Sequence, residues 1–104
     1  RKYGVNLWNS VPAFLDLLLT AADSASLAPS SLRHVWVSGD RVDRNLPKRL
    51  RGAMGANAYK LHAMGGATEA AIWSNIHEIG RELDPSWTSI PYGRPMRNQR
   101  MYVL

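Results

Sequence analysis

The alternation of apolar and polar residues divides the chain into segments with the periods of strands and helices. Residues 3–8 alternate well enough for a short strand, with apolar side chains at every second position. Residues 11–22 carry apolar side chains at helical spacing, which predicts an amphipathic helix. Residues 33–38 form a mostly apolar run that is typical of a buried strand. The first part of the chain therefore predicts the order strand, helix, strand.

The second part continues this alternation and then changes character. Asn45 can cap a second helix, Leu46 and Leu50 give it an apolar stripe, and Gly55 ends it. Residues 58–63 predict a third strand. Beyond them we expect a fourth apolar run over residues 70–76, a turn-rich stretch over residues 85–95 and a last strand over residues 99–104.

This order of elements predicts the fold class α/β. We expect a partial parallel sheet with crossover helices, a piece of a larger doubly wound subdomain, that ends in extra β-strands. Residues 1–104 should form a single fragment, with a parallel α/β part over residues 1–70 and a β-rich extension over residues 71–104. Ligands bind beyond the carboxyl ends of parallel strands. Three such ends should meet at one edge: residues 9–10, 38–40 and 64–66.

Composition narrows the classes of protein that remain. The 104 residues are 45% hydrophobic and 20% charged, which is a globular mixture. Cysteine is absent, which excludes disulfides, zinc–thiolate sites and thiol catalysis. No apolar run has the length of a membrane span, and no secretory leader is visible at the start. We expect a cytoplasmic protein with no membrane partner, and an excised piece of a longer chain.

The net charge is +5, from 13 Lys and Arg residues against 8 Asp and Glu residues. A basic balance is compatible with nucleic-acid binding. The cations are spread along the chain, so solvated faces explain them better than a binding patch does. We therefore expect no nucleic-acid partner.

Residues 65–69 (GGATE) form the sharpest local feature. Two glycines allow the backbone to approach a ligand closely. Thr68 can donate to a phosphate oxygen, and Glu69 can hold a hard cation such as magnesium. The alternative is a plain glycine turn followed by a solvated glutamate. A Walker phosphate loop is excluded because its lysine is missing.

Residues 38–40 and one tryptophan are further candidates. Gly39 could pack against a flat ring with Asp40 nearby, whereas the alternative is a strand-ending turn in which Asp40 bonds its own backbone. Trp73 could wall the same pocket, although packing in the core is the usual role of tryptophan. The three histidines have no partner at catalytic spacing, and structural or surface roles are favoured for them.

Four motifs occur in order along the chain: residues 8–13 (WNSVPA), 37–40 (VSGD), 65–74 (GGATEAAIWS) and 90–95 (IPYGRP). Together they resemble the adenylation domain of nonribosomal peptide synthetases, within the superfamily of acyl-AMP-forming enzymes. The similarity runs over all 104 residues and corresponds to a middle stretch of the large N-terminal subdomain. The GGATE form is similar to that of the subgroup that makes thiazoline and oxazoline rings and activates cysteine.

The resemblance implies a reaction and a nucleotide site. An amino acid's carboxylate would attack the α-phosphate of ATP and give aminoacyl-AMP and pyrophosphate. The acyl group would then pass to the phosphopantetheine thiol of a carrier protein domain. Thr68 and Glu69 would be the catalytic residues, with Thr68 on phosphate and Glu69 on magnesium. The positions that would bind ATP are Gly39, Asp40, Gly65, Gly66, Ala67 and Thr68.

Three positions depart from the pattern of most family members. An aromatic residue that stacks on the adenine usually stands where this chain has Gly65. Asparagine often stands in place of Ala63, and proline in place of Ala67. These departures bear mainly on the contacts with adenine.

The resemblance also implies an amino-acid pocket. Four of its positions, Asn9, Ser38, Ile72 and Trp73, match the set seen in cysteine-selecting domains. The other two differ and are bulky, so a cysteine-like or other small amino acid is expected. The six positions are Asn9, Trp36, Ser38, Met64, Ile72 and Trp73.

The family's glycine-rich phosphate loop, ribose-binding aspartate and C-terminal catalytic lysine lie outside this chain. The fragment alone is therefore expected to be inactive and to need the remainder of the adenylation domain. Two other hypotheses stay open. A non-catalytic relic with the same fold would keep unchanged exchange activity when Glu69 is mutated in the full-length protein. A basic nucleic-acid-binding module would bind duplex DNA in a salt-dependent manner.

Overall fold

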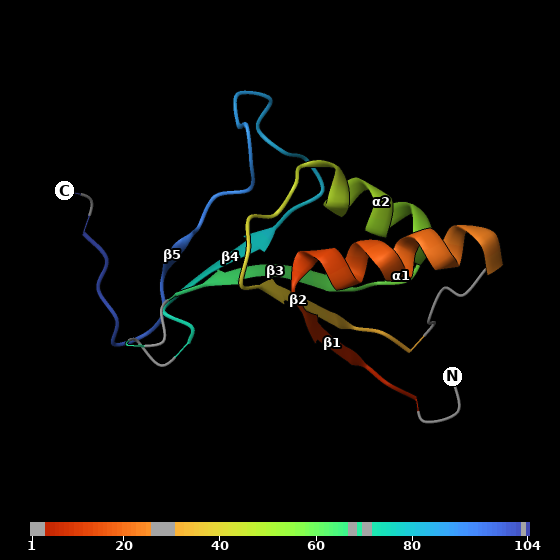
Figure 1. The fold of residues 1–104 in the computed structure, drawn as a ribbon, viewed down its shortest axis with the longest axis horizontal. Helices are drawn as coiled ribbons and strands as arrows, with labels where there is room; N and C mark the ends of the chain where they lie inside the picture. Colours follow the sequence, from red (N-terminus) through yellow and green to blue (C-terminus); the bar gives the residue numbers. More distant parts are fainter. Residues whose placement is uncertain (1–3, 26–30, 67–68, 70–71, 103) are drawn as a thin grey trace.

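The computed structural model describes residues 4–25, 31–66, 69, 72–102 and 104. These residues form one sheet of five strands and two α-helices. Both helices cover the same face of the sheet (Figure 1). In chain order, the elements are β1 (Leu7–Ser10), α1 (Pro12–Ala25), β2 (His34–Ser38), α2 (Asn45–Met54), β3 (Lys60–Gly65), β4 (Asn75–Ile79) and β5 (Arg94–Pro95).

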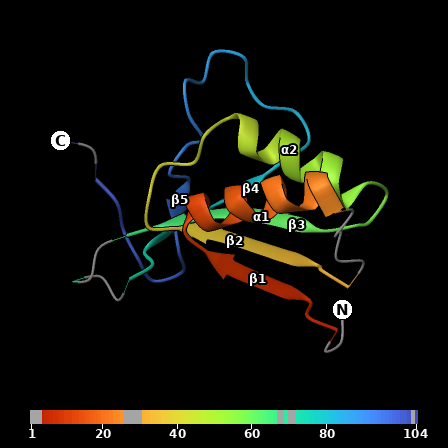
Figure 2. The same cartoon turned by 45° about the vertical axis from the view of Figure 1, so that its right-hand side comes forward.

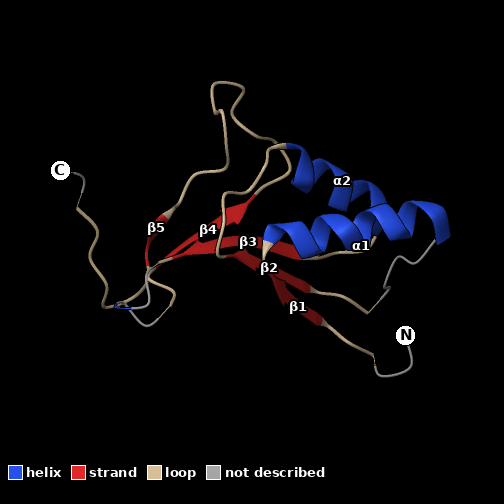
Figure 3. Cartoon of the chain, viewed as in Figure 1, coloured by secondary structure: helices blue, strands red, loops and turns tan. Residues whose placement is uncertain are grey.

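The sheet is mixed, with strand order β1-β2-β3-β4-β5. The first three strands are parallel, and their register places Asn9, Trp36 and His62 side by side. β4 runs antiparallel to β3, and β5 runs antiparallel to β4. The predicted α/β class, with parallel strands, helical connections and extra strands at the end, is confirmed (Figure 3).

The hydrophobic core lies between the two helices and the sheet face that they cover (Figure 2). Val35 and Val37 of β2 and Leu15 of α1 are all 0% exposed. Full burial of such a side chain contributes about 1.5–3 kcal/mol relative to an exposed one. Successive side chains of a strand point to opposite faces, so Trp36, between the two valines, lies on the uncovered face and is only half-buried. The helices therefore pack on one face of the sheet, and no described helix covers the other face.

The two helices follow the predicted pattern. Leu46, Leu50 and Met54 of α2 are buried at intervals of four residues, which matches the helical period. The side chain of Asp43 accepts a hydrogen bond from the N–H of Asn45 (2.7 Å), so Asp43 rather than Asn45 satisfies a free N–H group at the start of α2. Neither described helix combines the length and the apolar content that crossing a membrane requires.

The first and last strands differ from the sequence prediction. β1 begins at Leu7, and the described residues 4–6 before it are not part of the strand. The partner strand begins opposite Leu7, which pairs with His34, and the N–H of His34 donates to the Asn6 carbonyl oxygen (3.0 Å). Residue 3, where the predicted strand starts, lies outside the described residues. The predicted strand over residues 99–104 is wrong for the residues described there, which are exposed and pair with no described strand. β5 lies instead within residues 85–95, the stretch predicted to be rich in turns.

The strands on either side of the glycine turn start later than the sequence predicts. β3 covers Lys60–Gly65 rather than residues 58–63, and β4 covers Asn75–Ile79 rather than residues 70–76. Trp73 therefore precedes β4 and lies in the connection that leaves the glycine turn. This connection returns the chain to the edge where the parallel strands end.

Candidate functional site

The carboxyl ends of the three parallel strands meet at one edge of the sheet, as the sequence predicts. Ser10 of β1 pairs with Val37 of β2, and Ser38 of β2 pairs with Met64 of β3. The segments that follow β2 and β3 line a pocket of about 730 Å³, which we call the site pocket. Its lining contains these predicted site residues: Ser38, Gly39, Asp40, Met64, Gly65, Gly66, Ile72 and Trp73.

The remaining two amino-acid positions, Asn9 and Trp36, do not line the site pocket. They are neighbours in register on the sheet face that the helices leave uncovered. The ring of Trp36 meets the ring of Trp73 edge to face, with centroids 5.9 Å apart and planes at 82°. Neither tryptophan belongs to the core cluster, so the usual role of tryptophan in the core does not apply to this pair.

The turn after β3 depends on Gly66. Its φ is +151°, and a Cβ at this position would lie 2.5 Å from the carbonyl oxygen of Ile72 and 2.7 Å from the nitrogen of Ser74. The N–H of Ser74 donates to the carbonyl oxygen of Gly65 (2.8 Å), which closes the turn. Only glycine fits this conformation without displacing the backbone opposite. The closed turn thus holds Ile72 and Trp73 at the site pocket.

The turn after β2 contains the hydrogen bond of a strand-ending turn. Gly39 has a φ of +87°, and Oδ1 of Asp40 accepts a hydrogen bond from the N–H of Arg41 (2.7 Å). The side chain of Asp40 thus bonds the backbone beside it, which agrees with the alternative of a strand-ending turn. Gly39 and Asp40 line the site pocket as well, so the turn conformation is compatible with a ligand beside it.

The predicted phosphate and metal site comprises Ala67, Thr68 and Glu69. Ala67 and Thr68 lie outside the described residues. Glu69 is exposed and does not line the site pocket. No cluster of three His, Asp or Glu side chains that could hold a metal ion occurs in the described ranges. A magnesium ion at Glu69 would have one carboxylate ligand together with phosphate oxygens and waters, a donor set that magnesium accepts.

Tyr92 and Asn75 line the site pocket, although no sequence pattern assigns them to it. Tyr92 is 77% exposed, and a Cβ at Gly65 would lie 3.4 Å from its Cδ1. Asn75 is 3% exposed, and its side-chain N–H donates to the carbonyl oxygen of Tyr92. This bond ties the segment over residues 89–92 to the start of β4. Tyr92 thus lies beside the glycine at which the family resemblance leads one to expect an aromatic side chain.

His62 lies on the uncovered face of β3, with its side chain 17% exposed. Burial lowers the pKa of His62, and nearby Glu78, whose Oε2 lies 4.0 Å from Nε2, opposes this shift. His34 and Lys60 add to the lowering of the pKa. Nδ1 of His62 is buried with no hydrogen-bond partner in the described part of the chain. The neutral imidazole is therefore favoured at this position.

Known proteins share both the sequence and the fold. The sequence model of the AMP-binding enzyme family matches residues 1–104. The chain is 45% identical over 104 residues to pyochelin synthetase PchE of Pseudomonas aeruginosa, and 44% identical over 105 residues to the anguibactin system regulator of Vibrio anguillarum. Both matches cover 100% of this chain, but only 7% of PchE and 10% of the regulator. The chain thus spans about a tenth, or less, of these curated relatives.

Solved structures give the same result. The nonribosomal peptide synthetase FmoA3 matches with a TM-score of 0.90 at 44% identity in its AMPPNP-bound form. The form bound to α-methyl-L-serine-AMP matches with a TM-score of 0.89 at 43% identity. These matches cover 100% of this chain and 11% and 12% of the two FmoA3 chains. The chain belongs to the AMP-binding enzyme family and corresponds to a segment of a nonribosomal peptide synthetase adenylation domain.

Proposed function

We propose that this chain supplies the adenine and amino-acid sides of the active site of an amino-acid-activating adenylation domain. The observation that carries the proposal is the site pocket, where eight residues singled out from the sequence come together from the ends of β2 and β3 and the turn between β3 and β4. The complex of FmoA3 with α-methyl-L-serine-AMP, an amino acid joined to AMP, supports it at 43% identity.

In the proposed reaction, a carboxylate oxygen of the amino acid attacks the α-phosphorus of ATP. A bond forms between that oxygen and phosphorus, and the bond from phosphorus to the bridging oxygen of pyrophosphate breaks. Pyrophosphate leaves with the electron pair of the broken bond. Thr68 would donate a hydrogen bond to a phosphate oxygen, and Glu69 would hold magnesium, whose positive charge would offset the negative charge of the phosphates. The thiol of phosphopantetheine on a carrier domain then attacks the acyl carbon, and AMP leaves.

The adenine is proposed to lie beside Gly39, Asp40 and the glycine pair that follows β3. Gly65 offers no side chain for stacking. Tyr92 offers an exposed ring next to that position and lines the same pocket. We therefore assign to Tyr92 the aromatic surface against which the adenine stacks, a contact of the kind that contributes about 1–3 kcal/mol per base.

The amino acid is proposed to lie against the side chains at the ends of β2 and β3. Met64 and the edge-to-face pair of Trp36 and Trp73 leave less room than small residues would, which favours a small substrate side chain. Asn9 and Ser38 offer polar groups for a hydroxyl or a thiol. A cysteine-like or serine-like amino acid fits this combination, and the α-methyl-L-serine of the FmoA3 complex is of that size.

In this proposal, residues 1–70 and residues 71–104 both contribute side chains to the same site. The parallel part supplies the strand ends, and the β-rich part supplies Asn75 and Tyr92. The remainder of the adenylation domain would complete the phosphate and ribose contacts, so residues 1–104 alone are expected to be inactive. A reaction that uses ATP and a carrier domain fits a cytoplasmic location and needs neither nucleic acid nor a membrane.

The test is amino-acid-dependent exchange of pyrophosphate into ATP by the intact protein, measured with cysteine, serine and larger amino acids. Glu69→Gln keeps the shape of the side chain and removes its charge, so kcat/KM should fall by about 10²-fold. Glu82→Gln is the matched control, because Glu82 is exposed and does not line the site pocket. Exchange that Glu69→Gln leaves unchanged would refute the role proposed for Glu69, and a lack of exchange with every amino acid would favour the relic hypothesis.

A further inference from the structure

Asn75 is a buried polar residue at the edge of the sheet where the site pocket lies. It is the first residue of β4, it is 3% exposed, and it lines the site pocket. No other polar or charged residue that the structure describes is buried to this extent. A buried amide is costly unless its donors and its acceptor have partners. The partners of the Asn75 side chain therefore indicate what it does in the pocket.

The side chain of Asn75 lies over Gly65, at the end of the neighbouring strand. In the antiparallel register of β3 and β4, the two residues lie directly opposite each other. Residues in such a pair carry their side chains on the same face of the sheet. Gly65 has no side chain, and a Cβ there would lie 3.1 Å from both Nδ2 and Oδ1 of Asn75. The amide of Asn75 and the ring of Tyr92 therefore adjoin the same position.

One hydrogen bond fixes the orientation of this amide. Nδ2 of Asn75 donates to the carbonyl oxygen of Tyr92. A carbonyl oxygen only accepts, so the amide cannot be turned over without losing the bond. Nδ2 keeps a second N–H, and Oδ1 keeps its capacity to accept, because none of the described residues donates to it. Oδ1 is not among the described polar atoms that are closed to solvent without a partner, so it remains accessible.

The free groups of the amide match one edge of adenine. Adenine carries an amine donor, N6, next to a ring-nitrogen acceptor, and an asparagine amide bonds this pair with its oxygen and one N–H. Guanine and hypoxanthine carry a carbonyl oxygen in place of the amine. That oxygen would face Oδ1 with a second acceptor, and no hydrogen bond would form. The amide of Asn75 is thus complementary to adenine and not to a 6-oxopurine.

We infer that Asn75 selects the base of the nucleotide, with Oδ1 accepting a hydrogen bond from the N6 amine of adenine. The inference rests on the proposed function, in which adenine lies beside Gly65 and stacks on the ring of Tyr92. Ring and amide lie next to each other, because the amide bonds the backbone of the residue that carries the ring. Stacking on Tyr92 is open to every purine. The discrimination between purines is therefore assigned to Asn75.

The alternative is that Asn75 only tethers the segment over residues 89–92. In that case, loss of the amide would displace the ring of Tyr92 and weaken the binding of every purine nucleotide by the same factor. The ratio of the kcat/KM values for two purine nucleotides separates the two roles. Both values are measured on one preparation of enzyme, so the fraction of the protein that is folded cancels in the ratio.

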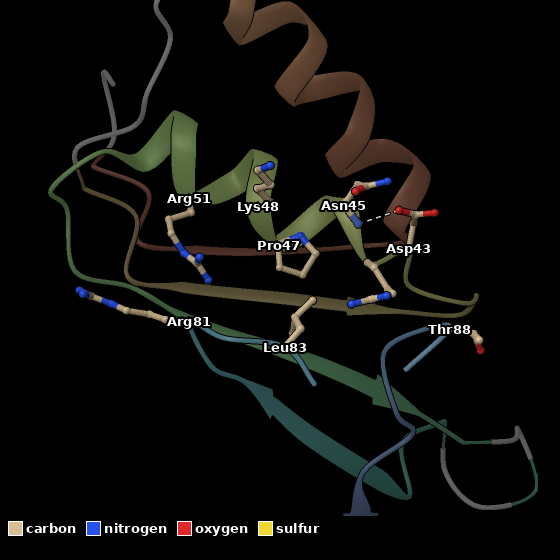
Figure 4. A pocket seen from close by; sticks show the side chains of 9 residues that line it. Asp43, Asn45, Pro47, Lys48, Arg51, Arg81, Leu83 and Thr88 are labelled. Atoms are coloured by element: carbon tan, nitrogen blue, oxygen red, sulfur yellow. Dashed lines mark hydrogen bonds between the residues drawn. The ribbon is translucent and has the colours of Figure 1, made fainter. Parts of the chain in front are cut away.

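The experiment compares ATP with inosine triphosphate, whose base is hypoxanthine, in amino-acid-dependent pyrophosphate exchange by the intact protein. We expect the unmodified protein to prefer ATP. Asn75→Leu keeps the branched shape over Gly65 without polar atoms, and it should reduce this preference by about 5- to 150-fold. Asn75→Ala should reduce it to the same extent. Asn45→Ala is the matched control and should leave the preference unchanged, because Asn45 is exposed and lines a separate pocket of about 610 Å³ beside α2 (Figure 4).

Asn75→Asp separates the acceptor from the tether, because it keeps an oxygen in place of Oδ1 and loses the N–H that bonds Tyr92. Its kcat/KM for ATP should fall, but its preference for ATP should persist. The inference is overturned if the unmodified protein uses both nucleotides equally, if Asn75→Leu and Asn75→Ala keep the full preference, or if Asn75→Asp loses it as they do. A protein that shows no exchange with any nucleotide and amino acid refutes the proposed function itself, and the inference with it.

Discussion

Because Gly65 and Tyr92 lie side by side, we predict that a ring added at Gly65 partly compensates for a ring removed at Tyr92 in nucleotide binding. Tyr92→Ala removes a ring that is 77% exposed in the site pocket, so it removes little that supports the fold. Gly65→Tyr adds a ring next to it. A Cβ at Gly65 would lie 3.1 Å from the side chain of Asn75 and 3.4 Å from Cδ1 of Tyr92, so the added ring crowds both residues when Tyr92 is present.

The expected magnitudes follow from the energy of stacking. A base stacked on an aromatic side chain contributes about 1–3 kcal/mol, and 1.4 kcal/mol corresponds to about a tenfold change in affinity. Tyr92→Ala should therefore raise the KM for ATP by about 5- to 150-fold. The KM for the amino acid should change little, because the proposed amino-acid contacts lie elsewhere in the pocket. Gly65→Tyr/Tyr92→Ala should recover part of the loss, since the double variant has a ring again and lacks the crowding between Gly65 and Tyr92.

The assay is the initial rate of amino-acid-dependent pyrophosphate exchange by the intact protein, measured over a range of ATP concentrations. Tyr92→Phe is the matched control: it keeps the ring, loses the hydroxyl and should bind ATP as the unmodified protein does. The assignment of Tyr92 is refuted if Tyr92→Ala is active with an unchanged KM for ATP, or if the KM values for ATP and amino acid rise by the same factor. The predicted compensation is refuted if the loss of ATP-binding free energy in Gly65→Tyr/Tyr92→Ala equals the sum of the losses in the two single variants.

Two further predictions concern the structure around the site pocket. Gly93→Ala should lower the unfolding midpoint of the intact protein, because the added Cβ would meet the carbonyl oxygen of Ile76 across the β4–β5 pair. Gly80→Ala is the control: its Cβ would meet no atom within 4 Å, so the unfolding midpoint should change little. Equal effects of the two substitutions would contradict this prediction. The pKa of His62 is lowered in the folded state. As the pH falls below about 6.5, His62 therefore takes up a proton more readily in the unfolded state, and the free energy of unfolding should decline. Unfolding midpoints between about pH 7.5 and pH 5.5 should fall less for His62→Gln than for the unmodified protein. His77→Gln is the control, because His77 is not among the groups that shift the pKa of His62. Identical profiles for His62→Gln and the unmodified protein would contradict the prediction.

The features that the sequence predicts well are those set by local periodicity. α2 is an example, because Leu46, Leu50 and Met54 repeat at the helical period and must share one buried face. The common edge of the strand ends also follows from the sequence, since parallel neighbours joined by helices have their carboxyl ends on the same side. The predicted positions at residues 38–40 and 64–66 meet for this reason.

The features that the sequence does not predict depend on partners far along the chain. A strand begins where its neighbour offers backbone groups, which is why β1 starts at Leu7, opposite His34. The alternating residues near the C-terminal end resemble a strand, but the described ones have no neighbouring strand to pair with. Tyr92 belongs to a turn-rich stretch whose path depends on the buried Asn75, and no local pattern indicates that its ring lies beside Gly65.

The arrangement around Gly65 bears on whether the parent domain is a working enzyme or a relic. In a decaying site, loss of an aromatic side chain would simply leave a gap. Here the ring of Tyr92 adjoins the position that lacks one, and the segment that carries it is held by a hydrogen bond from the buried Asn75. A buried amide is costly unless it is hydrogen-bonded, so this contact is a specific feature of the fold. Such a coordinated arrangement favours a functional nucleotide site. Tyr92→Ala and Glu69→Gln separate the two possibilities, because the first reports on nucleotide binding and the second on the chemical step.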